Sequence, residues 1–174
     1  MDSKVEEFHD QGFVCLEGAV DVSLIEKLRV QTMGNYEECM SIIKERELEF
    51  GIGIKHGFKE VVQRHTARFE MTHRMEELDC SFMDDEDSPI RQTVRGILGD
   101  DCIVANKSAV VSLAGASGQS WHSDGPHMSS TTHLPAHVLN VFIPLVPMTK
   151  ALGATEFRPK VRTLFAATPP SFQP

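Results

Sequence analysis

The sequence predicts an α+β fold built as a single domain over residues 1–174. The length and composition are those of one ordinary globular domain. Helical patterns dominate residues 1–98, whereas β-branched and small residues dominate residues 99–159. A run of helices followed by a run of strands is typical of α+β proteins rather than of alternating strand–helix units. Residues 160–174, with three prolines among the last six, are expected to form an irregular tail.

The first elements are expected to be a short helix, a strand and a long helix. Gly12 ends the short helix, and "FVCLEG" over residues 13–18 has the composition of a strand that turns at Gly18. Either Asp21 or Ser23 can cap the long helix that follows. Its apolar stripe, at helical spacing, consists of Leu24, Ile25, Leu28, Met40 and Ile43.

A further helix is expected over "SPIRQTVRGIL". Ser88 caps it, Pro89 occupies its first turn and Gly99 stops it. Residues 51–87 have no comparable pattern, apart from an acidic stretch at residues 84–87. That stretch lacks the spacing of a calcium-binding loop, so it is interpreted as a solvated turn.

Two apolar stretches account for the expected strands of the second half. The first, "CIVANKSAVVSLAG" over residues 102–115, is rich in β-branched and small residues. The second, "HVLNVFIPLVPM" over residues 137–148, is apolar almost throughout. Such a run of strand length is typical of a strand buried on both faces.

Charge and composition exclude several classes of partner. Twenty-five acidic against seventeen basic side chains give a net charge of -8, which opposes binding to nucleic acid or to an anionic membrane surface. No apolar run is long enough to span a membrane, and the N-terminus lacks the pattern of a signal peptide. Four scattered cysteines suggest reduced thiols rather than a disulfide framework or a zinc site. We therefore expect a cytoplasmic protein with a small-molecule substrate and neither a nucleic-acid nor a membrane partner.

The stretch "QSWHSDGPH", residues 119–127, contains the residues best suited to bind a metal or to act in catalysis. In an extended chain residues two apart point to the same face, so His122 and Asp124 would present an imidazole and a carboxylate side by side. With a second histidine, such a pair forms the 2-His-1-carboxylate triad of non-haem Fe(II) sites, which leaves open coordination positions. The H-x-D pattern alone is common, so a His–Asp dyad and a polar turn remain alternatives. A hydrolase with His122 as base is disfavoured, because no G-x-S-x-G elbow accompanies it.

The sequence "GQSWHSDGPH", followed by "LNVFIPLVPMTKALGATEFRP", resembles the core of the phytanoyl-CoA dioxygenase family of Fe(II)- and 2-oxoglutarate-dependent oxygenases. The opening "FHDQGFVCLEGAVDVSLIEKLR" is similar to the start of that family. The resemblance covers residues 7–30 and 99–159. It implies a double-stranded β-helix, a cupin-like jelly-roll, packed against the helices of the N-terminal half.

The resemblance also implies a reaction and a set of site residues. His122 and Asp124 would be two of the three protein ligands of Fe(II), with 2-oxoglutarate and O2 as cosubstrates. The reaction would couple oxidative decarboxylation of 2-oxoglutarate to succinate with hydroxylation of a small organic substrate. Lys107 and Asn140 are polar residues within apolar runs, so we expect them to contact 2-oxoglutarate or to support the metal ligands.

The chain departs from the family pattern after "GATEFRP". The family places its third ligand, a histidine, and an arginine for 2-oxoglutarate well beyond this segment, where the present sequence has no histidine and a single arginine, Arg162. We therefore expect a C-terminally truncated form of such an enzyme that lacks the last strands of the jelly-roll. Its uncovered sheet edges would favour self-association. The competing interpretation is a catalytically inactive jelly-roll module with a binding or regulatory role.

Several other residues are weaker candidates for the third iron ligand and for the group that binds 2-oxoglutarate. His127, His133 and His137 follow the motif, but they come from the same loop or its end rather than from a facing strand. Arg158 and Arg162 are weak candidates for binding a carboxylate. His56, His65 and His73 lie in a polar region that is expected to be helix or loop, with these histidines at the surface.

Overall fold

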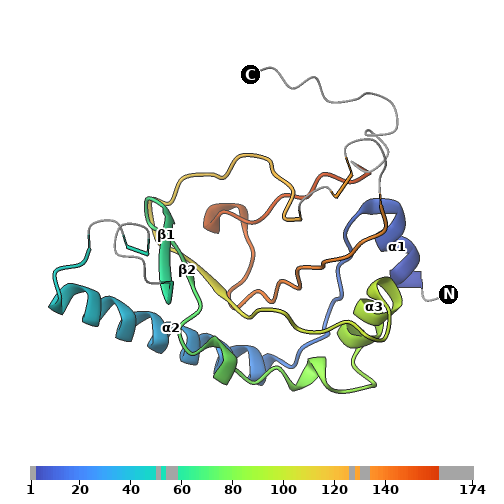
Figure 1. The fold of residues 1–174 in the computed structure, drawn as a ribbon, viewed down its shortest axis with the longest axis horizontal. Helices are drawn as coiled ribbons and strands as arrows, with labels where there is room; N and C mark the ends of the chain where they lie inside the picture. The colour runs from blue at the N-terminus through green and yellow to red at the C-terminus, as the bar shows by residue number, and fades with distance from the viewer. Residues whose placement is uncertain (1–2, 50–51, 54–58, 126–127, 130–133, 161–174) are drawn as a thin grey trace.

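The computed structural model describes residues 3–49, 52–53, 59–125, 128–129 and 134–160. Within these residues it contains three α-helices, a three-stranded sheet and three short 3-10 helices (Figure 1). The α-helices are α1 (Ser3–Gln11), α2 (Val22–Glu45) and α3 (Pro89–Leu98). The strands are β1 (Val61–His65), β2 (Arg68–Met71) and β3 (Ala109–Ser112). The 3-10 helices are η1 (Met75–Glu77), η2 (Ser81–Met83) and η3 (Lys150–Leu152). This mixture confirms the α+β class.

Helix α2 supplies one side of the core. Its N-cap is Asp21, whose carboxylate accepts a hydrogen bond from the Ser23 backbone N–H at 2.7 Å, so the first of the two candidate caps is used. The inner face of α2 packs against the sheet and against Met75 of η1. The buried core cluster consists of Tyr36, Cys39, Ile43, Ile52, Val61, Phe69, Met71, Met75 and Val111.

The sheet is antiparallel in the order β1-β2-β3. Met71 lies opposite Val61, and Phe69 lies opposite Val111. These four residues share the buried face, whereas Val110, one position from Val111, is 62% exposed. The sheet thus has one face on α2 and one face turned away from this core.

Helices α1 and α3 pack together at the other end of the molecule (Figure 1). As expected, Ser88 is the N-cap of α3, Pro89 lies in its first turn and Gly99 ends it with a φ of 97°. Gly12, with a φ of 88°, ends α1. The two helices meet closely at Gly96, where an added Cβ would lie 2.6 Å from Cγ2 of Val5.

Two expected strands are absent. Residues 13–18 connect α1 to α2 without strand pairing, although Gly18 does turn the chain with a φ of 65°. Residues 137–148, described in full, form no strand, and Val138, Val141 and Phe142 are 55%, 42% and 59% exposed. The prediction of a strand buried on both faces is therefore wrong for this structure. A strand needs a hydrogen-bonded neighbour, and in the part of the chain that is described the sheet ends at β3.

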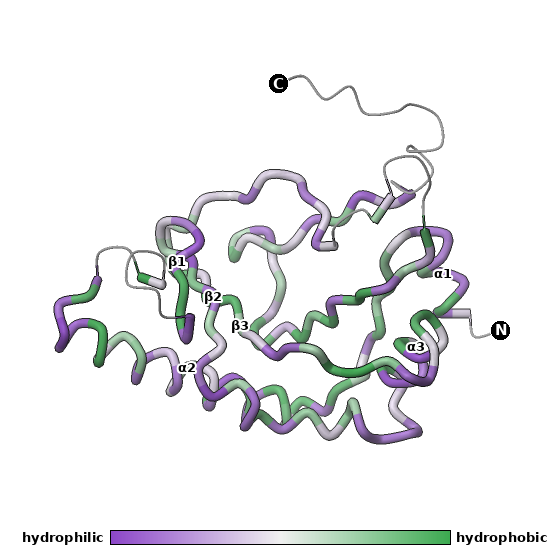
Figure 2. The backbone as a smooth tube through the Cα atoms, viewed as in Figure 1, coloured by the Kyte–Doolittle hydropathy of each residue, from purple (hydrophilic) through white to green (hydrophobic). Residues whose placement is uncertain are grey.

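Most of the described residues that follow α3 are irregular. Of the apolar stretch 102–115, only Ala109–Ser112 is a strand. Figure 2 shows that hydrophobic residues continue through this part of the chain, outside the helices and the sheet. The jelly-roll therefore stays a prediction. No helix in the described ranges is long and apolar enough to cross a membrane. Of the expected tail, only Lys160 lies within the described residues.

Candidate metal centre

His122 and Asp124 lie side by side in the irregular segment that follows β3. Nε2 of His122 is 3.3 Å from Oδ1 of Asp124. Nδ1 of His122 is 2.7 Å from the backbone carbonyl oxygen of Ser120. Because a carbonyl oxygen can only accept a hydrogen bond, Nδ1 is the nitrogen that carries a proton. The carbonyl thus orients the imidazole so that Nε2, the nitrogen left to bind a metal, faces the carboxylate.

Asn140 joins this pair from the apolar segment 137–148. Its Nδ2 donates a hydrogen bond to Oδ2 of Asp124 at 2.9 Å, across 16 residues of sequence. The two oxygens of Asp124 therefore have different partners, with Oδ2 on Asn140 and Oδ1 toward His122. The structure thus brings together three of the four residues that the sequence singled out.

The donor atoms suit a metal ion. Two ligand atoms with metal bonds of about 2.1 Å, separated by about 90° at the metal, lie about 3 Å from each other. The 3.3 Å between Nε2 and Oδ1 is close to this spacing. The side chains of His122 and Asp124 are 54% and 43% exposed, so the remaining coordination positions would be open.

A third protein ligand is not present in the part of the chain that the structure covers. No group of three His, Cys, Asp or Glu side chains there is arranged to hold a metal. His137 is exposed and completes no such group. His127 and His133 lie outside the described residues, as do His56 and Arg162. The described site therefore offers two of the three ligands of a facial triad.

Lys107 lies in a different environment from the other predicted site residues. Its Nζ donates to the backbone carbonyl oxygen of Leu78 at 3.4 Å. It lines a hollow of about 380 Å³ together with Thr72, Glu76, Val104, Ala105 and Asn106. Within the described ranges, Lys107 forms no hydrogen bond or ion pair with Asn140 or with the two candidate ligands.

Arg68 of β2 fixes the chain that leads into the motif. Its Nη2 donates to the Ser117 carbonyl oxygen at 2.6 Å, and its Nε donates to Oγ of Ser112 at 3.3 Å. One side chain of the sheet thus holds both ends of the turn between β3 and the motif. Nothing in the local sequence around Arg68 indicates this role, because the contact joins residues more than 40 positions apart.

The segment "GATEFRP" lies against the motif and against the N-terminal region. The guanidinium of Arg158 lies over the Trp121 ring, 4.7 Å from its centre, so Arg158 has an aromatic partner. Phe157 stacks on Phe13 with ring centres 4.9 Å apart. The Lys160 backbone N–H donates to the Gln11 carbonyl oxygen at 3.0 Å. These contacts bring together three separate parts of the sequence.

The remaining predicted surface histidines belong to the sheet region. His65 is exposed, as expected, but it lies in β1 rather than in a helix or loop. His73 is partly buried, and its Nε2 lies 3.5 Å from Oε2 of Glu38. Within the described residues, neither histidine forms an ion pair or a metal-binding group with the motif.

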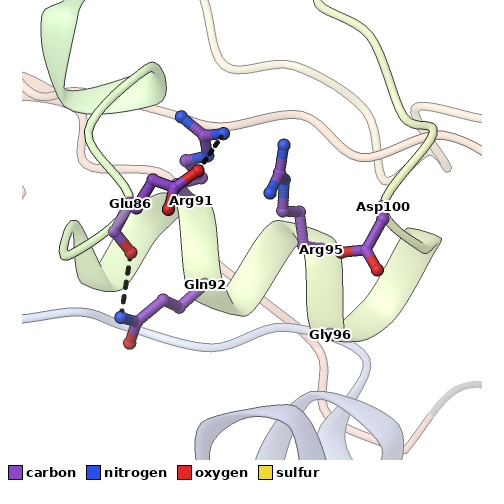
Figure 3. A pocket seen from close by; sticks show the side chains of 6 residues that line it. All are labelled: Glu86, Arg91, Gln92, Arg95, Gly96 and Asp100. Atoms are coloured by element: carbon purple, nitrogen blue, oxygen red, sulfur yellow. Dashed lines mark hydrogen bonds and ion pairs between the residues drawn. The ribbon is translucent and has the colours of Figure 1, made fainter.

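A second hollow, of about 490 Å³, lies on α3. Figure 3 shows Arg91 and Arg95 extending from the same side of the helix, with Glu86 beside Arg91 and Asp100 near the helix end. Arg91 is already held by the Asp84 carbonyl oxygen and, at 3.4 Å, by Glu86. Because two positive and two negative side chains line it, this hollow has no charge that selects an anion.

Comparison with known proteins gives one match. The family model of phytanoyl-CoA dioxygenase (PhyH) matches residues 8–167, which is most of the chain and includes both sequence motifs. No curated protein sequence matches, and no solved structure matches.

Proposed function

The chain belongs to the phytanoyl-CoA dioxygenase (PhyH) family, and from this premise we propose that His122 and Asp124 are two protein ligands of a catalytic Fe(II). Members of this family depend on Fe(II), 2-oxoglutarate and O2. The observation that carries the proposal is the 3.3 Å separation of Nε2 of His122 and Oδ1 of Asp124 within the matched region. The proposed activity is hydroxylation of a C–H bond in a small organic substrate.

The proposed reaction converts the substrate, 2-oxoglutarate and O2 into the hydroxylated product, succinate and CO2. Bound Fe(II) would supply open coordination positions at which O2 and the 2-oxo acid react. The chain's own residues hold the donor atoms. The Ser120 carbonyl oxygen keeps the proton of His122 on Nδ1, which leaves Nε2 available, and Asp124 contributes a negative charge that offsets part of the metal's charge.

Lys107 stays the candidate that the sequence offers for binding a carboxylate of 2-oxoglutarate, although the lining of its hollow includes neither His122 nor Asp124. Its ammonium group lines an open hollow and has one weak hydrogen bond to a backbone carbonyl oxygen, so exchanging that partner for a carboxylate costs little. The substitution Lys107→Met should raise the 2-oxoglutarate concentration needed for half-maximal turnover without changing the Fe(II) affinity. If Lys107→Met needs the same 2-oxoglutarate concentration as the wild type, Lys107 does not bind this cosubstrate.

A second candidate function is an inactive module that binds a ligand or regulates a partner. The observation in its favour is that the described residues hold two rather than three metal ligands. The two candidates differ in turnover, because only the enzyme consumes 2-oxoglutarate.

The test is an anaerobic titration of the apoprotein with Fe(II) and 2-oxoglutarate, followed by addition of O2. The enzyme should develop the weak visible charge-transfer band of the ternary complex and then release succinate. His122→Ala and Asp124→Ala should abolish both signals, whereas His65→Ala, an exposed histidine of β1, should retain them. A wild-type protein that gives neither band nor succinate would favour the inactive module.

A further inference from the structure

We propose that Asn140 is a positioning residue that fixes the carboxylate of Asp124 for metal binding, rather than a contact for 2-oxoglutarate. The inference rests on the proposed metal-binding function of Asp124. It chooses between the two roles that the sequence leaves open for Asn140, and it assigns a purpose to a hydrogen bond between residues 16 positions apart.

The direction of this hydrogen bond is fixed by chemistry. An ionised carboxylate has acceptors only, so the amide nitrogen of Asn140 must be the group that faces Oδ2 of Asp124. The bond is solvent-exposed and 2.9 Å long, and the charge of its acceptor strengthens it relative to a bond between neutral groups at the same place. The bond therefore restrains rotation of the carboxylate about its last torsion angle.

The restraint acts on the other oxygen as well. With Oδ2 held by Asn140, Oδ1 stays 3.3 Å from Nε2 of His122. The Ser120 carbonyl oxygen restrains the imidazole from its opposite side, at Nδ1. Each candidate ligand thus has one polar atom hydrogen-bonded to the protein and a second polar atom that faces the other ligand, where a metal ion would bind. Partners of this kind orient metal ligands, and their removal typically weakens metal binding by about 10- to 100-fold.

The position of Asn140 in the chain supports a specific role. Asn140 is a polar residue between the apolar residues Leu139 and Val141, in a stretch that is not paired into a sheet. Its side-chain hydrogen bond goes to Asp124, so it also connects residues 137–148 to the motif.

The experiment measures metal affinity without 2-oxoglutarate, using Co(II) in air and Fe(II) under anaerobic conditions. The variant Asn140→Leu keeps a similar size and removes the donor. Thr66→Leu is the matched control, because Thr66 is exposed in the turn between β1 and β2 and lines neither hollow. We expect the Kd of Asn140→Leu to rise about 10- to 100-fold and the visible Co(II) bands to shift, with the control unchanged. An unaltered Kd and Co(II) spectrum, with weaker 2-oxoglutarate binding, would overturn the inference.

A measurement on the apoprotein separates this inference from the proposed function. The side-chain amide resonance of Asn140, identified by its loss in Asn140→Leu, should move in a ¹⁵N NMR spectrum when Asp124 is changed to Ala. A resonance that does not move would show that Asn140 is not held by Asp124, whatever metal the protein binds. A wild-type protein that binds neither metal but shows the amide shift would instead refute the proposed function.

Discussion

The guanidinium of Arg158 lies 4.7 Å from the centre of the Trp121 ring, so the segment "GATEFRP" is in direct contact with the segment "SWHSD". Trp121 and Arg158 are 37 positions apart in the sequence, and the two segments that contain them carry the resemblance to the family. Phe157, next to Arg158, continues the contact to Phe13 of the N-terminal region. The parts of the sequence that resemble the family are thus the parts that meet in space.

Removing Arg158 should expose the ring of Trp121. The guanidinium covers one face of an indole that is 58% exposed, and Trp121 is the single tryptophan of the chain. We expect Arg158→Ala to increase quenching of the intrinsic tryptophan fluorescence by acrylamide. Arg46→Ala, at an exposed arginine at the end of α2, is the control and should leave the quenching constant as in the wild type. Equal quenching in all three proteins would contradict the contact.

Two helical glycines should respond in opposite directions to the same substitution. An alanine in a helix is usually about 1 kcal/mol more favourable than a glycine. Gly34 of α2 has no atom within 4 Å of an added Cβ, so Gly34→Ala should raise the free energy of unfolding by about that amount. At Gly96 the added Cβ would meet Val5, so Gly96→Ala should lower the free energy of unfolding by about 1–3 kcal/mol.

Urea unfolding of both variants checks this pair. The additional substitution Val5→Ala should recover part of the loss in Gly96→Ala, because it removes the atom that the new Cβ meets. If Gly96→Ala is stabilised like Gly34→Ala, α1 and α3 are not in the close contact described here.

The cap of α2 should make stability depend on acid pH. The hydroxyl and then the backbone N–H of Ser23 donate to Asp21, and these bonds lower the pKa of the Asp21 carboxyl. A lowered pKa in the folded state means that this contribution to stability is complete above pH about 4, the ordinary value for aspartate. It is lost as pH falls through the lower, folded pKa.

Asp21→Asn separates charge from capping, because asparagine also caps helices but does not titrate. The difference in urea midpoint between the wild type and Asp21→Asn should therefore shrink as pH falls below about 4. A difference that is constant between pH 7 and pH 2 would show that the ionised carboxylate has no part in the cap.

The features that the sequence predicted correctly depend on residues that are close together in the chain. Pro89 and Gly99 have conformational preferences that mark the ends of a helix in any context, and α3 begins and ends as they indicate. His122 and Asp124 are two positions apart, so their proximity also follows from short-range geometry. The sequence left two candidate N-caps for α2, Asp21 and Ser23, and in the structure Asp21 is the N-cap.

Contacts between distant segments were not predictable in this way. The hairpin of β1 and β2 was not predicted because its two strands are short and contain many polar residues. The alternation of apolar Phe69 and Met71 about polar Glu70 was the available signal. The apolar run 137–148 indicates a preference for burial but does not identify a partner strand. The bond between Asn140 and Asp124 likewise depends on how the chain folds back. The cytoplasmic location and the self-association through sheet edges remain predictions.

The most direct test of the proposed metal site is anaerobic equilibrium dialysis of the protein against Fe(II), with the bound metal counted per chain. We expect about one Fe(II) per wild-type chain, and a matching value for the control His65→Ala, because ligand identity and count define a metal site. His122→Ala and Asp124→Ala should each lose most of the bound metal. Binding that is equal in the wild type and in both ligand variants would contradict the assignment of His122 and Asp124 as the metal ligands.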